Sequence, residues 1–467
     1  MPELPEVETI KNILNSIVKN QTINDIEVLR SSTIDGDVNS FISSLKGETF
    51  LDVSRIGKYL IFHLSNDKVI ISHLRMEGKY FEYLENEHNS AYAKVIYHLS
   101  NNHKLIYDDS RCFGRLKLSN ESTYLKEKEI IKLGPEPFIK DPYELYKETR
   151  KIKTKIKTAL LDQTLMTGLG NIYVDETLFA SNIHPHTPAY LISLEDCKNI
   201  ITNASIILNK AIKAGGSTIK SYHPGKDLDG NFQTELLCYG KSGLTCPRCG
   251  HTFLFNKTNG RGTTYCLSCQ HKLGNPLNVG LTGKIASGKS FALEFFKNNG
   301  CEVISSDQIV KELYQKDEVI HLINKAFSLY FKDEINHKIL RDYLLIHPSD
   351  KKKLERLIHP LVKKEIINKM ELSKKDIRII EVPLLFKAHY EDIFDTLIVI
   401  DTNEESQDKR LIERVGNDYQ LMKEINKDNM IKENKRKAEF IIDNSGSKEE
   451  YIENLNSILN KLKSRLS

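Results

Sequence analysis

The hydrophobic residues of the first ~135 positions occur in short runs rich in β-branched and aromatic side chains, separated by Asn, Asp and Gly. The clearest runs are VIISHL, KVIYHL, KLIYDD and RLKL. Such runs predict β-strands. Before them, apolar residues recur at helical spacing from about Glu6 to Val18, which predicts one helix there.

The rest of the chain changes pattern twice. LGPEP at 133–137 is a break containing Pro and Gly, and residues 141–215 behind it have helical spacing with an interruption at TGLGN (167–171). A Cys-rich hairpin region follows to about residue 271. Beyond the short joint HKLGNP, the apolar runs EVISSD, IRIIEVPLL and TLIVID alternate with helical segments. This alternation is typical of a parallel sheet covered on both faces.

Length and composition exclude several classes of protein. The chain has 467 residues, which predicts two to four domains. With 40% hydrophobic and 28% charged residues, a disordered, collagen-like or coiled-coil chain is excluded. The sequence contains no apolar run of ~18 residues and its first residues lack a basic segment, so we expect neither a membrane span nor a secretory signal. Eight Cys are too few for a disulfide scaffold, which favours a reducing cytoplasm.

The distribution of charge is more informative than its sum. A net charge of +4 does not indicate a nucleic-acid-binding protein. However, five basic residues crowd into positions 150–157, and residues 236–273 contain five basic residues and no acid. One such run is commonly a solvated face, but two in the same half of the chain favour contact with phosphates.

Four cysteines have the spacing of a metal site. Two Cys-x-x-Cys pairs, separated by 16 residues, supply four thiolates: Cys246, Cys249, Cys266 and Cys269. Thiolates in this arrangement bind Zn²⁺ tetrahedrally, and four protein ligands close the coordination sphere. We therefore expect one structural zinc ion per chain. The segment between the pairs predicts a tight β-turn with Arg261 at its tip.

The first residues carry a candidate nucleophile. An initiator Met before Pro is normally removed, which would leave Pro2 with a free secondary amine. Such an amine has a pKa of ~8, so at neutral pH a part of it is unprotonated and able to attack an electrophilic carbon, forming an iminium. Glu3 beside it is a candidate for proton transfer.

A series of motifs then falls in the order of one known family. The motifs are MPELPEVET, Lys58 in IGKYL, HLRMEGKY at 73–80, DDSRCFG at 108–114, LLDQ at 160–163, GLGNIYVDE at 168–176, IHP at 183–185, AGGST at 214–218, NFQ at 231–233 and the four-Cys ribbon. Over residues 1 to about 272 the chain resembles the formamidopyrimidine-DNA glycosylase family. The resemblance implies a β-sandwich, a helix–two-turn–helix domain and a zinc ribbon, with damaged double-stranded DNA as the partner.

The resemblance assigns chemical roles near the N-terminus. Pro2 would attack C1′ of the damaged nucleotide and displace the base, and its Schiff base would permit β- and then δ-elimination. Glu3 would protonate the sugar ring oxygen, and Lys58 would contact a flanking phosphate and the lesion. With Arg261, these residues form the expected catalytic group of this half.

The same resemblance assigns DNA contacts. Met76, Arg111 and Phe113 match the side chains that fill the space left by a flipped nucleotide. Asn171 and Arg261 would bind backbone phosphates.

Two features depart from the family. Cys112 stands where a second basic residue is usual, and HNSAYAKV lacks paired histidines, so we expect weaker DNA affinity but unchanged chemistry. The alternative in this half is the sister family with endonuclease VIII preference for oxidised pyrimidines. The LPEVE continuation and the GLGNIYVDE spelling favour the purine-lesion branch.

The second half carries a phosphate-binding loop, G-x4-G-K-S, directly after the strand LNVGL. Its backbone N–H groups cradle phosphates, the lysine reaches the β/γ-phosphates and the serine holds Mg²⁺. The expected ATP-binding residues are Gly283, Lys284, Ile285, Ala286, Ser287, Gly288, Lys289 and Ser290, with Ser290 on Mg²⁺.

Further motifs connect this half to a second family. GLTGKIASGKS, SSDQIV at 305–310, LRDYLL at 340–345, LERLIHP at 354–360, EVPLLF at 381–386, Gln407 with Arg410 and Arg414, and FIIDNSG at 440–446 resemble dephospho-CoA kinase. The resemblance implies transfer of the ATP γ-phosphoryl to a ribose 3′-hydroxyl, with Asp307 as candidate base and Lys289 neutralising charge. Glu381 replaces the usual Asp, and the lid alignment near Lys423, Glu424, Ile425 and Asp428 is atypical.

The sequence thus predicts a cytoplasmic, monomeric, bifunctional enzyme. The expected domains are residues 1–135 (catalytic β-sandwich), 136–235 (helix–two-turn–helix), 236–272 (zinc ribbon with four Cys ligands) and 277–467 (an α/β P-loop kinase with a parallel sheet). Because only HKLGNP joins complete blocks, we expect separable chemistries. The alternatives are another P-loop small-metabolite kinase in the second half, or a DNA-binding module with a regulatory ATPase.

Overall fold

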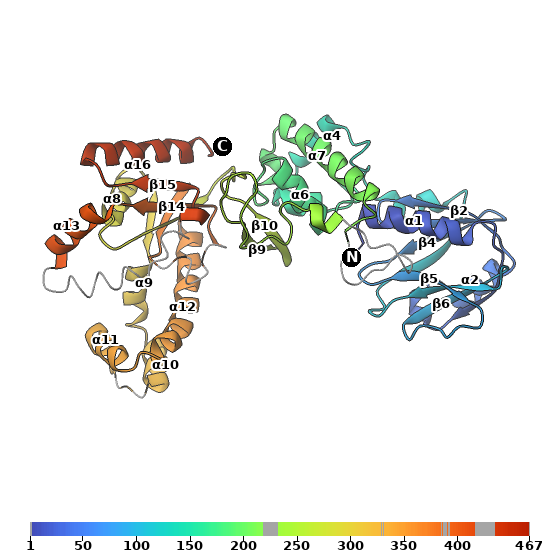
Figure 1. Cartoon of the computed structure of the whole chain (residues 1–467), viewed down its shortest axis with the longest axis horizontal. Helices are drawn as coiled ribbons and strands as arrows, with labels where there is room; N and C mark the ends of the chain where they lie inside the picture. Colours follow the sequence, from blue (N-terminus) through green and yellow to red (C-terminus); the bar gives the residue numbers. More distant parts are fainter. Residues whose placement is uncertain are drawn as a thin grey trace. The chain divides into compact units, whose positions relative to one another are not determined.

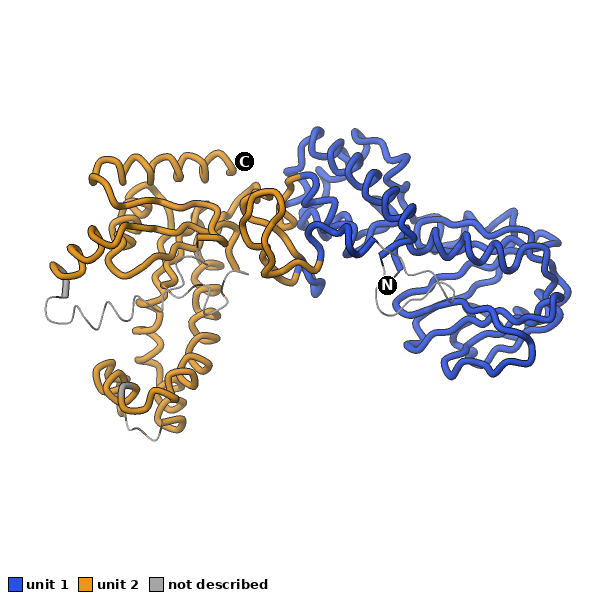
Figure 2. The backbone as a smooth tube through the Cα atoms, viewed as in Figure 1, with its two compact units in different colours: residues 1–181, 188–239, 258–263 blue, residues 182–187, 240–257, 264–467 orange. Residues whose placement is uncertain are grey.

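The computed structural model describes residues 2–217, 232–327, 329, 331–383, 385, 390, 393–415 and 435–466 (Figure 1). Asn231 and the atypical lid positions 423–428 lie outside this part, as do Leu384 and Phe386 of the EVPLLF motif. The chain forms two compact units (Figure 2). Unit 1 comprises residues 1–181, 188–239 and 258–263, and unit 2 comprises residues 182–187, 240–257 and 264–467.

Unit 1 begins with the expected helix and a β-sandwich. Helix α1 (Leu4–Val18) precedes two four-stranded antiparallel sheets, ordered β1-β6-β7-β5 and β2-β3-β4-β8. The strands are β1 Ile23–Val28, β2 Phe50–Ile56, β3 Tyr59–Leu64, β4 Lys68–His73, β5 Lys79–Leu84, β6 Ala93–Leu99, β7 His103–Asp108 and β8 Arg115–Asn120. One apolar cluster joins the inner faces of both sheets with α1 and with α2 (Val38–Leu45), which makes this part a sandwich.

Helix α1 starts where it does because its first turn is capped. The side chain of Glu3 accepts the backbone N–H of the third helical residue, and Glu6 accepts the N–H of Glu3 in return. This reciprocal pairing satisfies N–H groups that a helix end would leave open. The face carrying Val7, Ile10 and Leu14 is buried in the sandwich core.

A helical region completes unit 1. Its longer helices are α4 (Pro142–Thr149), α5 (Ile156–Leu160), α6 (Asn171–Ala180) and α7 (Leu194–Lys213), after the short α3 (Lys128–Ile131). The interruption expected at TGLGN is the segment just before α6. Helices α4 and α6 both pack on α7.

The ribbon contains a two-stranded sheet of β9 (Leu254–Thr258) and β10 (Arg261–Tyr265). Asn259 and Gly260 connect them with φ of 48° and 75°. Positive φ at both positions is the geometry of a type I′ hairpin turn, which Asn-Gly favours. Arg261 is therefore the first strand residue after the turn rather than its tip.

Unit 2 is built on a parallel sheet of order β12-β13-β11-β14-β15. The strands are β11 Leu277–Gly283, β12 Glu302–Ser305, β13 Ile377–Glu381, β14 Thr396–Asp401 and β15 Phe440–Asp443. The helices are α8 Lys289–Asn298, α9 Ser306–Leu313, α10 Asp317–Phe327, α11 His337–Ile346, α12 Asp350–Leu372, α13 Glu404–Val415 and α16 Lys448–Lys463. The expected α/β P-loop architecture is confirmed.

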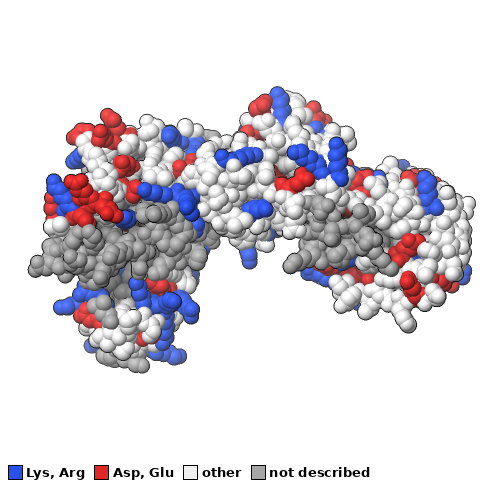
Figure 3. Space-filling model, viewed as in Figure 1, with Lys and Arg blue, Asp and Glu red and all other residues white. Residues whose placement is uncertain are grey.

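Alternate strand residues serve two cores. In β14, Ile398 and Ile400 join the cluster under α8 and α16, whereas Leu397 and Val399 join the cluster under α9, α10 and α12. Both faces of the sheet are thus covered, which explains the near-continuous apolar strands. Among the described residues, no helix is long and apolar enough to cross a membrane. Basic and acidic side chains both appear on the visible face of each unit (Figure 3).

Candidate active sites

The carboxylate of Glu3 lies at the N-terminus of α6. It accepts backbone N–H groups from Gly170 at 2.7 Å, Ile172 at 3.0 Å and Tyr173 at 3.4 Å. A Cβ on Gly170 would lie 2.4 Å from Oε1 of Glu3, so only glycine permits this approach. Burial raises the pKa of Glu3, against the opposing effect of the nearby Lys58 charge. A buried carboxyl of raised pKa, next to the buried Pro2, can hold a proton for transfer.

A second buried carboxylate, Glu6, connects the start of the chain to two other segments. One oxygen accepts the N–H of Glu3 at 2.9 Å. The other accepts the hydroxyl of Tyr173 at 2.7 Å and the N–H and hydroxyl of Ser217 at 2.8 and 2.9 Å. Glu6 therefore holds the N-terminus, α6 and the end of the AGG segment in one arrangement.

Lys58 reaches this site from the turn between β2 and β3. Its side chain is buried, and Nζ donates to the carbonyl of Leu169 at 2.6 Å. Burial lowers the pKa of Lys58 to about 8, with the charge of Glu3 opposing this shift and that of Arg261 assisting it. Glu3 and Lys58 thus lie near each other, and the charge of Arg261 also acts on Lys58.

The start of β10, which carries Arg261, is anchored within unit 1. The carbonyl of Gly262 accepts Nζ of Lys157 at 2.9 Å and Nδ2 of Asn171 at 3.0 Å. Lys157 also pairs with Asp175 at 2.6 Å, and both side chains are buried. Asn171 is the first residue of α6, and its Oδ1 is buried without a hydrogen-bond partner among the described residues. A helix N-terminus with these groups suits an anion.

The three candidate inserting side chains lie on two exposed loops. Met76 follows β4, and Arg111 and Phe113 follow β7, with the guanidinium of Arg111 over the Phe113 ring at 5.1 Å. The loops meet at the buried Tyr107 hydroxyl, because a Cβ on Gly78 would lie 2.4 Å from it and one on Gly114 1.6 Å from it.

Asp109 fixes the second of these loops. Its carboxylate accepts the N–H of Arg111 at 3.0 Å and that of Gly114 at 2.7 Å. Cys112, between Arg111 and Phe113, has a φ of 59°. Arg111 and Phe113 are thus presented by a loop with a set conformation.

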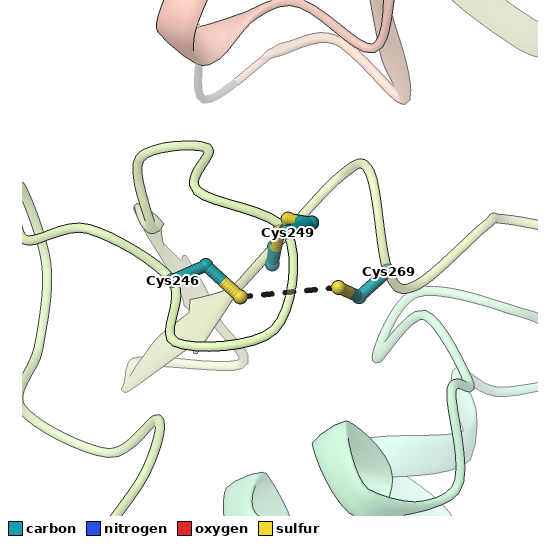
Figure 4. Close-up of side chains that lie close together, drawn as sticks. Cys246, Cys249 and Cys269 are labelled. Carbon is teal, nitrogen blue, oxygen red and sulfur yellow. Dashed lines mark hydrogen bonds between the residues drawn. The ribbon is translucent and has the colours of Figure 1, made fainter.

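The four ribbon cysteines form one cluster. Their Sγ atoms all lie within 4.8 Å of one another, with Cys246–Cys269 at 3.8 Å and Cys249–Cys266 at 3.5 Å. Figure 4 shows Cys246, Cys249 and Cys269 of this cluster, with a dashed line between Cys246 and Cys269. Tetrahedral Zn–S bonds of ~2.3 Å place sulfur atoms ~3.8 Å apart, so the cluster fits Zn²⁺. With four thiolates, the ion would be structural.

The phosphate-binding loop runs from the end of β11 to the start of α8. Nζ of Lys289 donates to the carbonyls of Gly283 at 2.9 Å and Lys284 at 2.8 Å. Gly288 has a φ of 102°, and a Cβ there would lie 2.2 Å from Asn444 Nδ2. Ser290 is exposed in the first turn of α8, where its hydroxyl would be available to Mg²⁺.

Three side chains from the last third of the chain hold this loop. Gln407 donates to the carbonyl of Ile285 at 2.7 Å, Asn444 to that of Ser287 at 2.8 Å, and Tyr451 to that of Gly288 at 3.1 Å. Arg410 approaches Asn444 Oδ1 at 3.5 Å, and its Nη1 is buried without a hydrogen-bond partner in the described part. Gln407 and Arg410 are therefore at the loop, as the motif suggested, whereas the side chain of Arg414 lies outside the described part.

Asp307 lies in the first turn of α9 and lines a cavity of about 230 Å³. The remaining lining residues are Ser306, Val310, Tyr314, Leu354, Glu355, Ile358, His359, Val362, Val382, Pro383 and Tyr390. Because the strands are parallel, the phosphate-binding loop after β11 and this cavity beside the ends of β12 and β13 share the carboxyl edge of the sheet. That edge is the usual ligand-binding side.

Family models match both halves. The formamidopyrimidine-DNA glycosylase N-terminal domain matches residues 1–116, its H2TH domain residues 133–223, and the zinc finger found in FPG and IleRS residues 243–272. The glycosylase of Mycoplasma mobile is 41% identical over 272 residues, 58% of this chain and 99% of that protein. The glycosylase of Ligilactobacillus salivarius is 42% identical over 274 residues, which are 58% of this chain and 99% of that protein. This chain belongs to the formamidopyrimidine-DNA glycosylase family.

Solved structures of glycosylases also match this chain. A Lactococcus lactis FPG mutant in complex with a Fapy-dG containing DNA has a TM-score of 0.56 and 38% identity, covering 58% of this chain and 100% of that one. A complex of Lactococcus lactis Fpg with an abasic site containing DNA has a TM-score of 0.55 and 38% identity, and it covers the same shares of the two chains. Residues 277–450 match the dephospho-CoA kinase family, so the chain fuses a glycosylase to a kinase.

Sequence reasoning about the glycosylase and kinase halves missed several positioning residues. Glu6 lies inside the recognised MPELPEVET motif, and its capping-box spacing from Glu3 was a usable signal. Asp109 and Asn444 also lie inside quoted motifs, but their hydrogen bonds reach loops that periodicity does not place. Lys157 was visible only as one member of a basic run, although it is fully buried.

Proposed function

We propose that this chain excises oxidised purines from DNA by an N-terminal proline mechanism and also phosphorylates dephospho-CoA. The observation that carries the first activity is the meeting of Glu3, Lys58 and the start of α6 beside Pro2. The phosphate-binding loop and the Asp307 cavity at one sheet edge carry the second.

In the glycosylase reaction, the Pro2 nitrogen, freed by removal of Met1, attacks C1′ of the damaged nucleotide. The C1′–N bond breaks, and the base leaves with the bonding electron pair. Glu3 donates a proton to the ring oxygen, which opens the sugar and leaves an iminium at C1′. Loss of a C2′ proton then breaks the C3′–O bond and expels the 3′-phosphate with the bonding pair, and loss of the C4′ proton breaks the C5′–O bond and expels the 5′-phosphate in the same way. The raised pKa of Glu3 favours its protonated form at the start.

DNA engagement places the lesion at Pro2. Met76 and Phe113 enter the stack as apolar wedges, and Arg111 hydrogen-bonds the orphaned base. Asn171 and Arg261 bind backbone phosphates, with the hairpin anchored through Gly262. The partner is damaged double-stranded DNA, and 8-oxoguanine and formamidopyrimidines are the proposed lesions.

Borohydride trapping tests this assignment. Borohydride reduces the iminium, so it should link the full chain covalently to a duplex containing 8-oxoguanine opposite cytosine. An undamaged duplex of the same sequence should give no linkage. Undiminished trapping by a Pro2→Gly variant that retains Met1 would contradict the mechanism.

In the kinase reaction, the ribose 3′-hydroxyl of dephospho-CoA attacks the ATP γ-phosphorus, and the bond from that phosphorus to the bridging oxygen breaks. Asp307 accepts the hydroxyl proton, and Lys289 neutralises charge on the transferred group. Ser290 would hold Mg²⁺, which supplies charge neutralisation when bound. The largely apolar cavity beside Asp307 suits the acceptor.

Product analysis tests the kinase. Incubation of the full chain with ATP, Mg²⁺ and dephospho-CoA should yield coenzyme A, identified by mass and by the position of its new phosphate. Asp307→Asn should lower kcat, whereas Asp317→Asn, on the neighbouring helix α10, serves as the matched control. Phosphorylation of simple nucleoside monophosphates in preference to dephospho-CoA would contradict this function.

A further inference from the structure

Within unit 2, the end of the ribbon is joined to the kinase domain by a buried ion pair. Nζ of Lys272 lies 2.8 Å from Oδ2 of Asp395, and the two side chains are 11% and 9% exposed. The same ammonium donates to the carbonyl of Pro276 at 2.9 Å. Asp395 also accepts the N–H of Asn278 at 2.9 Å. Removal of either charge would leave the other buried and under-compensated.

A second ionic group lies beside the first. Glu439, which is 5% exposed, accepts hydrogen bonds from Arg465, and its carboxylate lies 3.0 Å from His271. Although burial opposes its charge, His271 and Arg465 hold the pKa of Glu439 below its usual value. His271 belongs to the ribbon, whereas Glu439 and Arg465 belong to the kinase domain.

Backbone and apolar contacts extend the same surface. The N–H of Thr252 donates to the carbonyl of Arg436 at 2.8 Å, and the N–H of Gly274 donates to that of Arg465 at 2.9 Å. Leu254, Tyr265 and Leu267 of the ribbon belong to one of the two apolar clusters of the kinase domain, the one under α9, α10 and α12. We call this set of contacts the ribbon–kinase interface.

We propose that the ribbon and the kinase domain fold as one cooperative unit through the ribbon–kinase interface, so that the kinase draws part of its stability from a glycosylase module. The proposal concerns folding and does not depend on either proposed activity. It adds shared stability to the expectation of separable chemistries. These contacts join a ribbon that resembles one family to a kinase domain that resembles another. The motifs of either family alone therefore do not indicate them.

The four ribbon cysteines lie close in sequence to the ribbon residues of this interface. His271 and Lys272 follow Cys269 by two and three residues, and Thr252 follows Cys249 by three. Metal binding to four thiolates orders the backbone that carries them. The zinc ion would therefore hold the ribbon side of the interface in register, and its loss should be felt in the kinase domain.

A single fluorophore can report unfolding of the kinase domain in the full chain. The protein contains no Trp, so Phe291→Trp on α8, at a partly exposed site packed beside the kinase core, provides one reporter. In this background we compare Lys272→Met with Lys257→Met, because Lys257 is an exposed lysine of the same ribbon. Zinc content is measured on every variant.

We expect Lys272→Met to lower the thermal midpoint of the reporter by roughly 5 °C or more, while Lys257→Met shifts it by about 1 °C or less. If Lys272→Met fails to fold, His271→Ala, which removes the ribbon partner of Glu439 and leaves the contacts of Glu439 with Arg465 intact, should give the same direction of shift. Equal midpoints for the Lys272 and Lys257 variants, both with full zinc, would overturn the proposal.

Zinc removal provides a second, independent test of the proposal. Chelation from the full chain should lower the same midpoint by several degrees, and Lys272→Met should then add little, because changes in one shared contact are not additive. A reporter midpoint unmoved by chelation, in a chain shown to have lost its zinc, would establish that the kinase domain folds independently.

Discussion

The carboxylate of Glu3 accepts the backbone N–H of Gly170 at 2.7 Å, which joins the residue after Pro2 to the start of α6. The residues are 167 positions apart, so the position of Glu3 depends on the helical region of unit 1 as well as on the start of the chain. Gly168 also connects the segment before α6 to the start of the chain, since its carbonyl accepts the N–H of Leu4 at 3.1 Å. These hydrogen bonds hold the residues next to Pro2 in place, which is the preorganisation that the proposed mechanism needs.

Glu3→Gln should abolish base excision. Glutamine has the shape of glutamate, and its single side-chain oxygen can accept some of the same N–H groups. It cannot donate a carboxyl proton to the sugar. We expect a loss of at least about 100-fold in excision from an 8-oxoguanine duplex, measured by single-turnover cleavage. Coenzyme A formation by the same preparation serves as the control and should be unchanged. Retained excision would assign the proton transfer to another group.

DNA binding should depend on pH through Lys58. Its pKa of about 8 in the free protein means that the ammonium is charged below pH 8 and neutral above it. If only the charged form binds phosphate, affinity should fall by up to about tenfold between pH 7 and pH 9. The measurement is fluorescence anisotropy with a tetrahydrofuran abasic duplex at constant ionic strength.

Lys58→Arg is the matched control for this pH effect. Arginine keeps its charge throughout this range, so the Lys58-dependent part of the pH profile should disappear. A profile that falls equally in both proteins would place the titrating group elsewhere.

Gly114→Ala should disturb the loop that carries Arg111 and Phe113. The added Cβ would lie 1.6 Å from the Tyr107 hydroxyl, so the loop or the ring must shift. Such overpacking costs about 1–3 kcal/mol in the free energy of unfolding. Tyr107→Phe removes the closest atom and should rescue part of this loss, while costing little alone, because the hydroxyl has no hydrogen-bond partner in the described part. A double-mutant cycle by urea unfolding measures the rescue, and strict additivity would contradict the proposed clash.

The sequence predicted most elements because their signals are local. The helix expected from about Glu6 begins at Leu4, since the capping pair of Glu3 and Glu6 starts it earlier than the apolar spacing indicated. The four cysteines came together because each pair is held by a short turn. The phosphate-binding loop likewise needs only a strand, a glycine-rich turn and a helix.

Contacts between distant segments were not predictable in the same way. Nothing local to Asn444 indicates that it supports the carbonyl of Ser287, and nothing local to Lys272 indicates Asp395 as its partner. Both pairings depend on the order of strands in the sheet. The ribbon–kinase interface is another such case, since the short joint suggested independence, whereas the buried contacts support the proposed shared stability.

Lys289→Ala should separate the two activities at the level of chemistry. It removes the ammonium that lies 2.9 Å from the carbonyl of Gly283 in the phosphate-binding loop. Loss of one such electrostatic group typically lowers kcat by roughly 10²–10³-fold, which steady-state formation of coenzyme A would measure. Strand cleavage should stay within about twofold, because Lys289 has no part in the Glu3 and Lys58 site and distant sites behave additively. Shared stability does not weaken this expectation, since a change in the phosphate-binding loop leaves the ribbon–kinase interface intact. If Lys289→Ala abolished excision in a chain with an unchanged unfolding midpoint, the phosphate-binding loop would have to act as an energy source or regulator for the DNA-processing half.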